Sequence, residues 1–248
     1  MDNVPLDFAE NVINQFGILS QSFQNLNCIQ SFLSSFSKQR LNKRILIITI
    51  SFTDAGCFYD NRSNLSLFEP KTHEVEEVAF FRHQASYMEE LTKDTLKTIS
   101  RILRSQKSRI GRVRIQADQG HTTISKILES IRGIEELTLY SPFPLEPSVL
   151  RKTQCMYGGA DAPLAKSLES TVLEIIRMEL PIMISCCIPE ERKEFVEELN
   201  LALDQKQPSQ SKEEKFNSGT SGSISCVVKS TWGAFYDLTI INPYLLKQ

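Results

Sequence analysis

The centre of the chain carries two strand-like patterns separated by one helix-like pattern. Apolar and basic residues alternate over 109–117, and apolar residues alternate again over 134–140. Val113 in the first run corresponds to Leu137 in the second, and the spacing 137 − 113 = 24 lies within the roughly 20–29 residue period of leucine-rich-repeat-type units. Between them, residues 122–132 carry apolar side chains at helical spacing. The pattern predicts a strand–helix–strand unit in an α/β protein.

Two apolar stripes predict the main helices of this region. Residues 87–104 place apolar side chains three and four positions apart, which predicts a long amphipathic helix. For the central helix, 122–132, Gly120 and Thr122 mark the start and Gly133 marks the end. Both helices are expected to pack one apolar face against a sheet.

An apolar, β-branched run precedes these helices. Residues 45–50 form an apolar run interrupted only by Thr49, which suits a buried strand. A turn follows, and the runs 57–59, 65–68 and 74–81 predict three further strands. We expect the first three segments to form an antiparallel meander, with 74–81 as an additional strand.

The rest of the chain is less regular. Residues 141–161 hold three prolines and are expected to be irregular. The other predictions are a strand over 170–180, a helix over 189–203, a mobile polar loop over 205–222, and a closing pair of strands over 224–229 and 234–241.

Two helical stripes rich in phenylalanine open the chain. Pro5 suits the first position of a short helix, and Phe8, Val12 and Phe16 lie on one face of it. A second apolar stripe follows over 21–37. These patterns predict a helical module over 1–42, followed by an α/β domain over 43–248. The domain is expected to be a curved sheet with repeat-like strand–helix units and a C-terminal β-hairpin.

Composition narrows the function classes. The chain is 41% hydrophobic and 23% charged with a formal net charge of −2, which gives no reason to expect nucleic acid or an anionic membrane as a partner. Its six cysteines show no zinc spacing, and reduced, mostly buried thiols are expected. No signal peptide or membrane span is apparent, so the cytoplasm or the nucleus is the expected location.

No catalytic constellation stands out. His121 follows Asp118 and Gly120 at a strand-to-helix turn, and Cys155 could be paired with it as a thiol and imidazole of a hydrolase. No nucleophile signature accompanies them, so a structural role is favoured. The Gly158–Gly159 pair lacks the lysine of a phosphate loop and predicts a bend. We expect no enzyme activity, cofactor, metal or small-molecule ligand.

A run of basic residues between 97 and 114 has no intervening acid. A solvated outer face is the simpler interpretation. The alternative is a docking patch for an acidic partner, and a protein is favoured over nucleic acid because no aromatic residue is interleaved. The residues of this candidate patch are Lys97, Arg101, Arg104, Arg112 and Arg114.

The amino-terminal pattern resembles the opening of the F-box-like proteins that are expanded in nematodes. The positions that carry the resemblance are Val4, Pro5, Phe8, Val12 and Phe16, with later aromatics at Phe32 and Phe36. The remainder of the chain looks like the F-box-associated, leucine-rich-repeat-like region of that group.

The resemblance implies a substrate-recognition subunit of a cullin-type ubiquitin ligase. A Skp-type adaptor would bind Val4, Pro5, Leu6, Phe8, Val12 and Phe16. The α/β region would bind the target protein. An ordinary F-box has a Pro-x-Asp-Leu step between its first helices, where this chain has residues 17–20, Gly-Ile-Leu-Ser. The alternative is therefore a stand-alone protein-binding scaffold whose helices only cap the α/β domain.

Overall fold

The chain has a mixed α/β fold in a computed structural model. The structure describes residues 42–60, 62, 65–82, 87–117, 120–141, 143–158, 171–175, 178, 182–189, 194, 225–231 and 235–241. It divides into two compact units, Met1–Leu137 and Thr138–Gln248. This division falls inside the region 43–248, which the sequence pattern predicts to be one domain.

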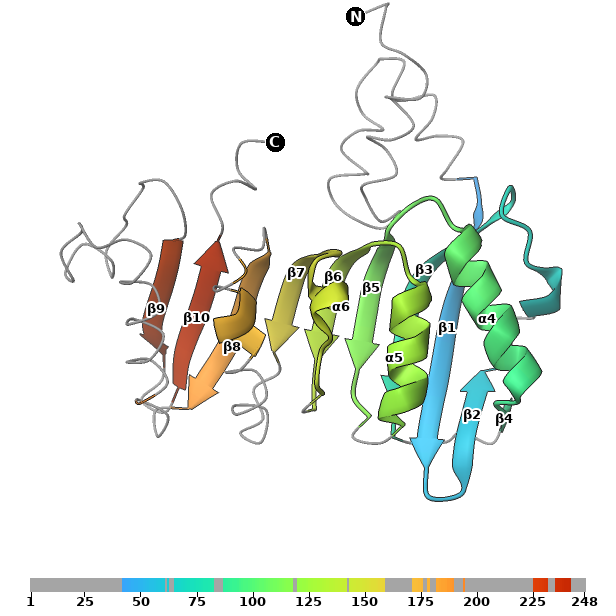
Figure 1. The fold of residues 1–248 in the computed structure, drawn as a ribbon, viewed down its shortest axis with the longest axis horizontal. Helices are drawn as coiled ribbons and strands as arrows, with labels where there is room; N and C mark the ends of the chain where they lie inside the picture. Colours follow the sequence, from blue (N-terminus) through green and yellow to red (C-terminus); the bar gives the residue numbers. More distant parts are fainter. Residues whose placement is uncertain are drawn as a thin grey trace, which may run out of the picture. The chain divides into compact units, whose positions relative to one another are not determined.

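Unit 1 is built on a mixed sheet (Figure 1). Its strands are β1 (Arg44–Thr53), β2 (Gly56–Asp60), β3 (His73–Phe81), β4 (Met88–Glu90), β5 (Ile110–Ile115) and β6 (Ile134–Leu139), whose first four residues belong to this unit. They lie in the order β4-β2-β1-β3-β5-β6. β2 is antiparallel to β1 and β4, whereas β3 is parallel to both β1 and β5.

Two helices cover one face of this sheet (Figure 1): α4 (Lys93–Ser105) and α5 (His121–Ser130). Successive side chains of a strand point to opposite faces, and those beneath the helices are almost entirely buried. The core formed in this way contains Leu46, Ile48, Ile50, Phe52, Val75, Val78, Phe80, Ile99, Ile102, Leu103, Val113, Ile115, Ile124, Ile127, Leu128 and Leu137.

The predicted strand–helix–strand unit is present as β5, α5 and β6, and β5 and β6 are neighbours in the sheet. Their first residues lie 24 positions apart, since 134 − 110 = 24. Gly120 caps the start of α5 in a left-handed conformation, with φ 72°, and a Cβ there would lie 2.1 Å from the Phe52 ring. Thr122 lies within the helix. The helix ends at Ser130, before the predicted end at Gly133.

The predicted meander is wrong beyond its first hairpin. β1 and β2 form the expected antiparallel pair, but residues 65–67 form a 3₁₀ turn, η2 (Leu65–Leu67), and β3 pairs with β1 in parallel. The polar segment before β3 carries the chain back along the sheet, which a short meander turn would not do. Local patterning predicts strands but not which strand each one pairs with.

The helix predicted over 87–104 begins later than expected. Met88–Glu90 form the edge strand β4, and Thr92 caps α4 by accepting a hydrogen bond at Oγ1 from the Thr95 N–H, at 3.1 Å. This cap satisfies one of the free N–H groups at the helix start. The buried residues are those of the predicted stripe, Ile99, Ile102 and Leu103.

Unit 2 contains a second set of strands. Its elements are α6 (Pro147–Leu150), β7 (Thr153–Gly158), a helical segment over 171–175, β8 (Met183–Pro189), β9 (Ser225–Thr231) and β10 (Phe235–Ile241). The strands lie in the order β7-β8-β10-β9. β7 and β8 are parallel, and β10 is antiparallel to both β8 and β9.

In unit 2 two predictions fail and one strand is not predicted. The region 141–161 is not irregular, because it forms α6 and β7. The strand predicted over 170–180 is a helix over 171–175, with Val172, Leu173 and Ile175 buried. Strand β8 is absent from the predicted elements. A short apolar run suits a buried helix as well as a strand, so periodicity alone assigns this segment wrongly.

Several predicted segments lie outside the described residues. These are the amino-terminal helices up to residue 37 and the polar loop over 205–222. Of the helix predicted over 189–203, residue 194 is helical, and Pro189 is the last residue of β8.

Candidate protein-interaction face

The face of the unit 1 sheet opposite α4 and α5 carries exposed apolar side chains. β1 shows this most clearly, because Leu46 and Ile48 are buried while Ile45 and Ile47 are 45% and 46% exposed. Successive residues of a strand point to opposite faces, so both exposed isoleucines lie on the same side. The expectation that residues 45–50 form a buried strand is therefore confirmed on the face beneath α4 and α5, where Leu46, Ile48 and Ile50 are buried, and wrong for Ile45 and Ile47.

Strand register places charged residues next to these isoleucines. Ile47 is paired with Glu77 of β3, which is paired with Arg112 of β5. One step along, Thr49 is paired with Ala79, which is paired with Arg114. Paired residues point to the same face of a sheet. We call this surface the open face, and its residues are Ile45, Ile47, Thr49, Glu77, Ala79, Arg112 and Arg114.

Glu77 lies between two arginines on the open face. Arg114 donates to Glu77 Oε1 through Nε at 2.9 Å and also through Nη2. Arg112 Nη1 lies 3.5 Å from Glu77 Oε2, and its Nε lies 3.9 Å from Glu136 Oε1. Glu77 is 9% exposed, whereas Arg112 and Arg114 are 45% and 34% exposed. One buried carboxylate therefore holds two guanidinium groups that still reach solvent.

This arrangement suits contact with another protein. Arginine combines apolar contact area with several hydrogen-bond donors in a fixed plane, and it is enriched where proteins bind one another. Because Glu77 restrains Arg112 and Arg114, less side-chain entropy is lost when a partner binds them. The neighbouring Ile45 and Ile47 supply apolar area that a partner can remove from water.

The structure divides the predicted basic patch between two surfaces. Lys97, Arg101 and Arg104 are exposed on α4, where Lys97 Nζ forms an ion pair with Asp94 at 2.9 Å. Arg112 and Arg114 lie on the open face, on the other side of the sheet. The five residues are therefore not one surface.

The predicted adaptor-binding residues Val4, Pro5, Leu6, Phe8, Val12 and Phe16 lie outside the described residues. His121 begins α5, but its side chain and Asp118 are also outside them. Cys155 in β7 of unit 2 and Cys57 in β2 are half-buried and form no disulfide. Burial raises the pKa of the Cys57 thiol.

A polar cluster lies near β4, the edge strand of the sheet. Arg62 donates through Nε and Nη2 to the carboxylate of Asp60, with distances of 2.6–3.1 Å. The guanidinium also lies 3.9 Å from the centre of the Tyr87 ring, a cation–π contact. These hydrogen bonds hold the pKa of Asp60 below its usual value. The cluster ties residue 87 to the end of β2, so we assign it a structural role.

In the described part of the chain, no three His, Cys, Asp or Glu side chains are grouped as metal ligands. Within the same residues, no helix is both long and apolar enough to cross a membrane.

The sequence pattern does not predict that Ile45 and Ile47 are exposed or that Glu77 lies on the same face. A signal is present in β5, where Arg112 and Arg114 alternate with Val113 and Ile115. This two-residue period indicates a strand with one polar face, and parallel neighbours of that strand share the face. Applying it to β1 and β3 requires the sheet order, which the sequence does not reveal.

Comparison with known proteins adds little. No family model matches the chain, and no curated protein is found to be similar to it. One solved structure shows a similarity, at 17% sequence identity and a TM-score of 0.22: "Crystal structure of RSP in complex with beta-NAD+ and operator DNA". The similarity covers 64% of this chain and 76% of that chain. With so low a TM-score, it supports no inference about fold or function.

Proposed function

We propose that the chain is a non-enzymatic protein-recognition subunit, which holds a target protein beside a cullin-type ubiquitin ligase through a Skp-type adaptor. The observation that carries the recognition role is the open face, where Ile45 and Ile47 are exposed beside the Arg112–Glu77–Arg114 group. Exposed apolar side chains next to restrained arginines favour a protein as the ligand.

The tethering role rests on the amino-terminal resemblance to F-box-like proteins. In that role Leu6, Phe8, Val12 and Phe16 contact the adaptor, while the open face holds the target. Two contacts on one chain raise the effective concentration of the target beside the ligase without any chemistry by the chain itself.

Differential capture tests the recognition role. The full chain and an Ile45→Ser/Ile47→Ser variant are used to capture proteins, which are then quantified by mass spectrometry. The variant is expected to capture about tenfold less of the specific partner, because two apolar contacts are removed from the surface.

Leu67→Ser is the matched control, because Leu67 is 67% exposed and lies in η2, outside the strands β1, β3 and β5 that form the open face. It is expected to retain the partner. Equal loss in the control, or unchanged capture by the open-face variant, would contradict recognition through this surface.

A stand-alone scaffold is the second candidate function. The observation that favours it is the Gly-Ile-Leu-Ser sequence over 17–20, at the place of the F-box Pro-x-Asp-Leu step. In this case the amino-terminal helices cap the α/β domain. Deleting residues 1–42 would then expose apolar surface and cause aggregation, whereas an independent tethering module can be removed without this effect.

A further inference from the structure

The amino ends of the unit 1 strands carry a concentration of positive charge. The segments that lead into β1, β3, β5 and β6, together with the end of α4, contribute seven cations, and we call them the basic edge: Lys43, Arg44, Lys71, Arg104, Lys107, Arg109 and Arg132. The leading segments themselves, 42–44, 69–73, 106–109 and 131–133, contain one carboxylate, that of Glu69.

Hydrogen bonds show that these segments are neighbours in space. The Arg44 N–H donates to Thr72 O at 2.8 Å, which joins the start of β1 to the start of β3. Ser108 Oγ donates to Glu74 Oε1 at 2.8 Å, and the Ile110 N–H donates to Gly133 O at 2.9 Å. The four strand starts therefore form one continuous edge.

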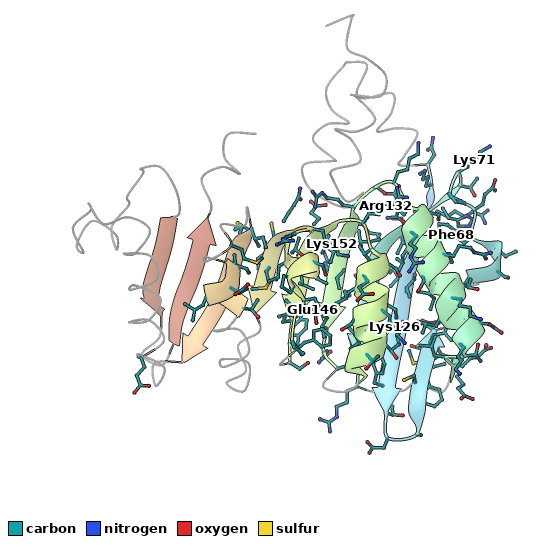
Figure 2. All side chains as sticks on the ribbon, viewed as in Figure 1. Phe68, Lys71, Lys126, Arg132, Glu146 and Lys152 are labelled. Carbon is teal, nitrogen blue, oxygen red and sulfur yellow. The ribbon has the colours of Figure 1, made fainter. Side chains whose placement is uncertain are left out.

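Figure 2 shows Lys71 and Arg132 at this end of the unit, while Lys126 of α5 lies farther from it. Arg104 belongs to the last turn of α4, which ends at the same edge. Cations at helix ends are favoured by the helix dipole, which accounts for Arg104. The dipole does not account for Arg44 or Lys71, since neither lies in the last turn of a helix in the described residues.

Two of these cations interact with carboxylates of the protein itself, Lys43 with Glu74 and Arg109 with Glu135. Lys43 Nζ lies 3.7 Å from the buried carboxylate of Glu74. Burial lowers the pKa of Arg109, and the nearby Glu135 opposes that shift. Four exposed cations form no ion pair within the described part of the chain: Arg44, Lys71, Arg104 and Arg132.

The basic edge borders the open face. Arg44 and the exposed Ile45 are the first two residues of β1, and their side chains point to opposite faces of the sheet, so a segment that crosses this edge can meet both. A polyanion such as nucleic acid would use the cations but would gain little from the isoleucines. A protein segment with acidic side chains beside apolar ones would use both.

We propose that the basic edge of unit 1 binds an acidic segment of the target protein, with apolar side chains of the same segment contacting Ile45 and Ile47. This inference rests on the proposed recognition function and gives its ligand a chemistry: aspartate- or glutamate-rich sequence next to leucine-like residues. The cations also speed the encounter with such a segment.

Fluorescence anisotropy of labelled short peptides tests this with the full chain. The probes are a glutamate-rich peptide with two leucines, the same peptide with serine for leucine, a lysine-rich counterpart, and single-stranded DNA. The leucine-containing acidic peptide is expected to bind most tightly, and to weaken severalfold between about 50 and about 200 mM salt, because screening reduces exposed charge interactions.

The decisive variant is Lys71→Glu/Arg104→Glu/Arg132→Glu. It is expected to weaken binding of the acidic peptide by about tenfold or more, since each exposed ion pair contributes modestly and three are reversed. The matched control is Lys93→Glu/Arg101→Glu/Lys126→Glu, which makes the same change in net charge at exposed helix positions. It is expected to bind within about twofold of the wild type, because only long-range electrostatics change.

Each other outcome overturns the inference. Equal weakening in both variants would show a nonspecific charge effect, and absence of acidic-peptide binding would remove the site. DNA binding that exceeds peptide binding and ignores Ile45→Ser/Ile47→Ser would assign the edge to nucleic acid. If the basic-edge variant still captures the target that the open-face variant loses, this inference fails while the recognition function stands. Thermal unfolding of every variant confirms that it is folded.

Discussion

At the scale of single residues, the buried side-chain amide of Gln106 takes the place of backbone hydrogen bonds where the pairing of β3 with its neighbours is interrupted. β3 contains an extra residue, Glu76, between the Val75–Leu46 and Glu77–Ile47 pairs. Its pairing with β5 begins only at Glu77. Gln106 Oε1 accepts from the Val75 N–H, and Gln106 Nε2 donates to Val75 O, both at 2.7 Å. A glutamine just after a helix would ordinarily be expected to face solvent, so its sequence context gives no sign of this role.

Replacing Gln106 by leucine is expected to lower the free energy of unfolding by about 2–4 kcal/mol, because two buried backbone groups lose their partners. Chemical denaturation of the full chain measures this. Gln116→Leu is the control, since the Gln116 side chain is exposed, and its effect is expected to stay within about 0.5 kcal/mol. A loss of similar size in both variants would contradict the role assigned to Gln106.

At the scale of elements, the sequence predicts those defined by local periodicity and fails where pairing is long-range. The central unit follows from its alternation and its helical spacing, and α5 lies where its apolar residues predict. The parallel pairing of β1 with β3 joins residues such as Ile47 and Glu77, which are 77 − 47 = 30 positions apart, and leaves no local signature. The segment 171–175 shows a different limit, because four of its five residues are buried, which removes most of the contrast that distinguishes a helix from a strand.

The extra residue of β3, Glu76, occupies the space that a side chain at Gly111 of β5 would need. A Cβ at Gly111 would lie 1.9 Å from Glu76 Oε1, and the Glu76 side chain is buried. Gly111→Ala is therefore expected to destabilise the protein by about 1–3 kcal/mol through overpacking.

A double-mutant cycle checks this explanation of the bulge. Gly111→Ala combined with Glu76→Ala is expected to cost less than the sum of the single variants, because shortening Glu76 makes room for the added methyl group. Unfolding free energies from denaturant titration provide the four values. Additive effects would show that the glycine is needed for another reason.

At the scale of the whole molecule, the surfaces proposed for target binding both belong to unit 1. The open face and the basic edge are formed by strands brought together from residues 43–136. The basic residues are recognisable in the sequence. Because they follow one another along the chain, the sequence suggests one patch, but Arg112 and Arg114 lie on the opposite side of the sheet from the basic residues of α4. Side-chain chemistry can be read from the sequence, whereas the face on which a side chain lies depends on sheet order and helix cover.

The proposed tethering role depends on the amino-terminal residues reaching an adaptor. In this role, the full chain recognises its target with unit 1 and joins the ligase through Phe8, Val12 and their neighbours. Open-face variants should therefore leave adaptor binding unchanged, and adaptor-binding variants should leave target binding unchanged.

The most direct test of the tethering role is the mass of the full chain mixed with a purified Skp-type adaptor, measured by size-exclusion chromatography with light scattering. Tethering predicts a stable complex of one chain with one adaptor, lost in Phe8→Asp and in Val12→Asp but retained in Ile45→Ser/Ile47→Ser. Folded wild-type chain that elutes free of adaptor, at concentrations where ordinary F-box proteins form the complex, would contradict it.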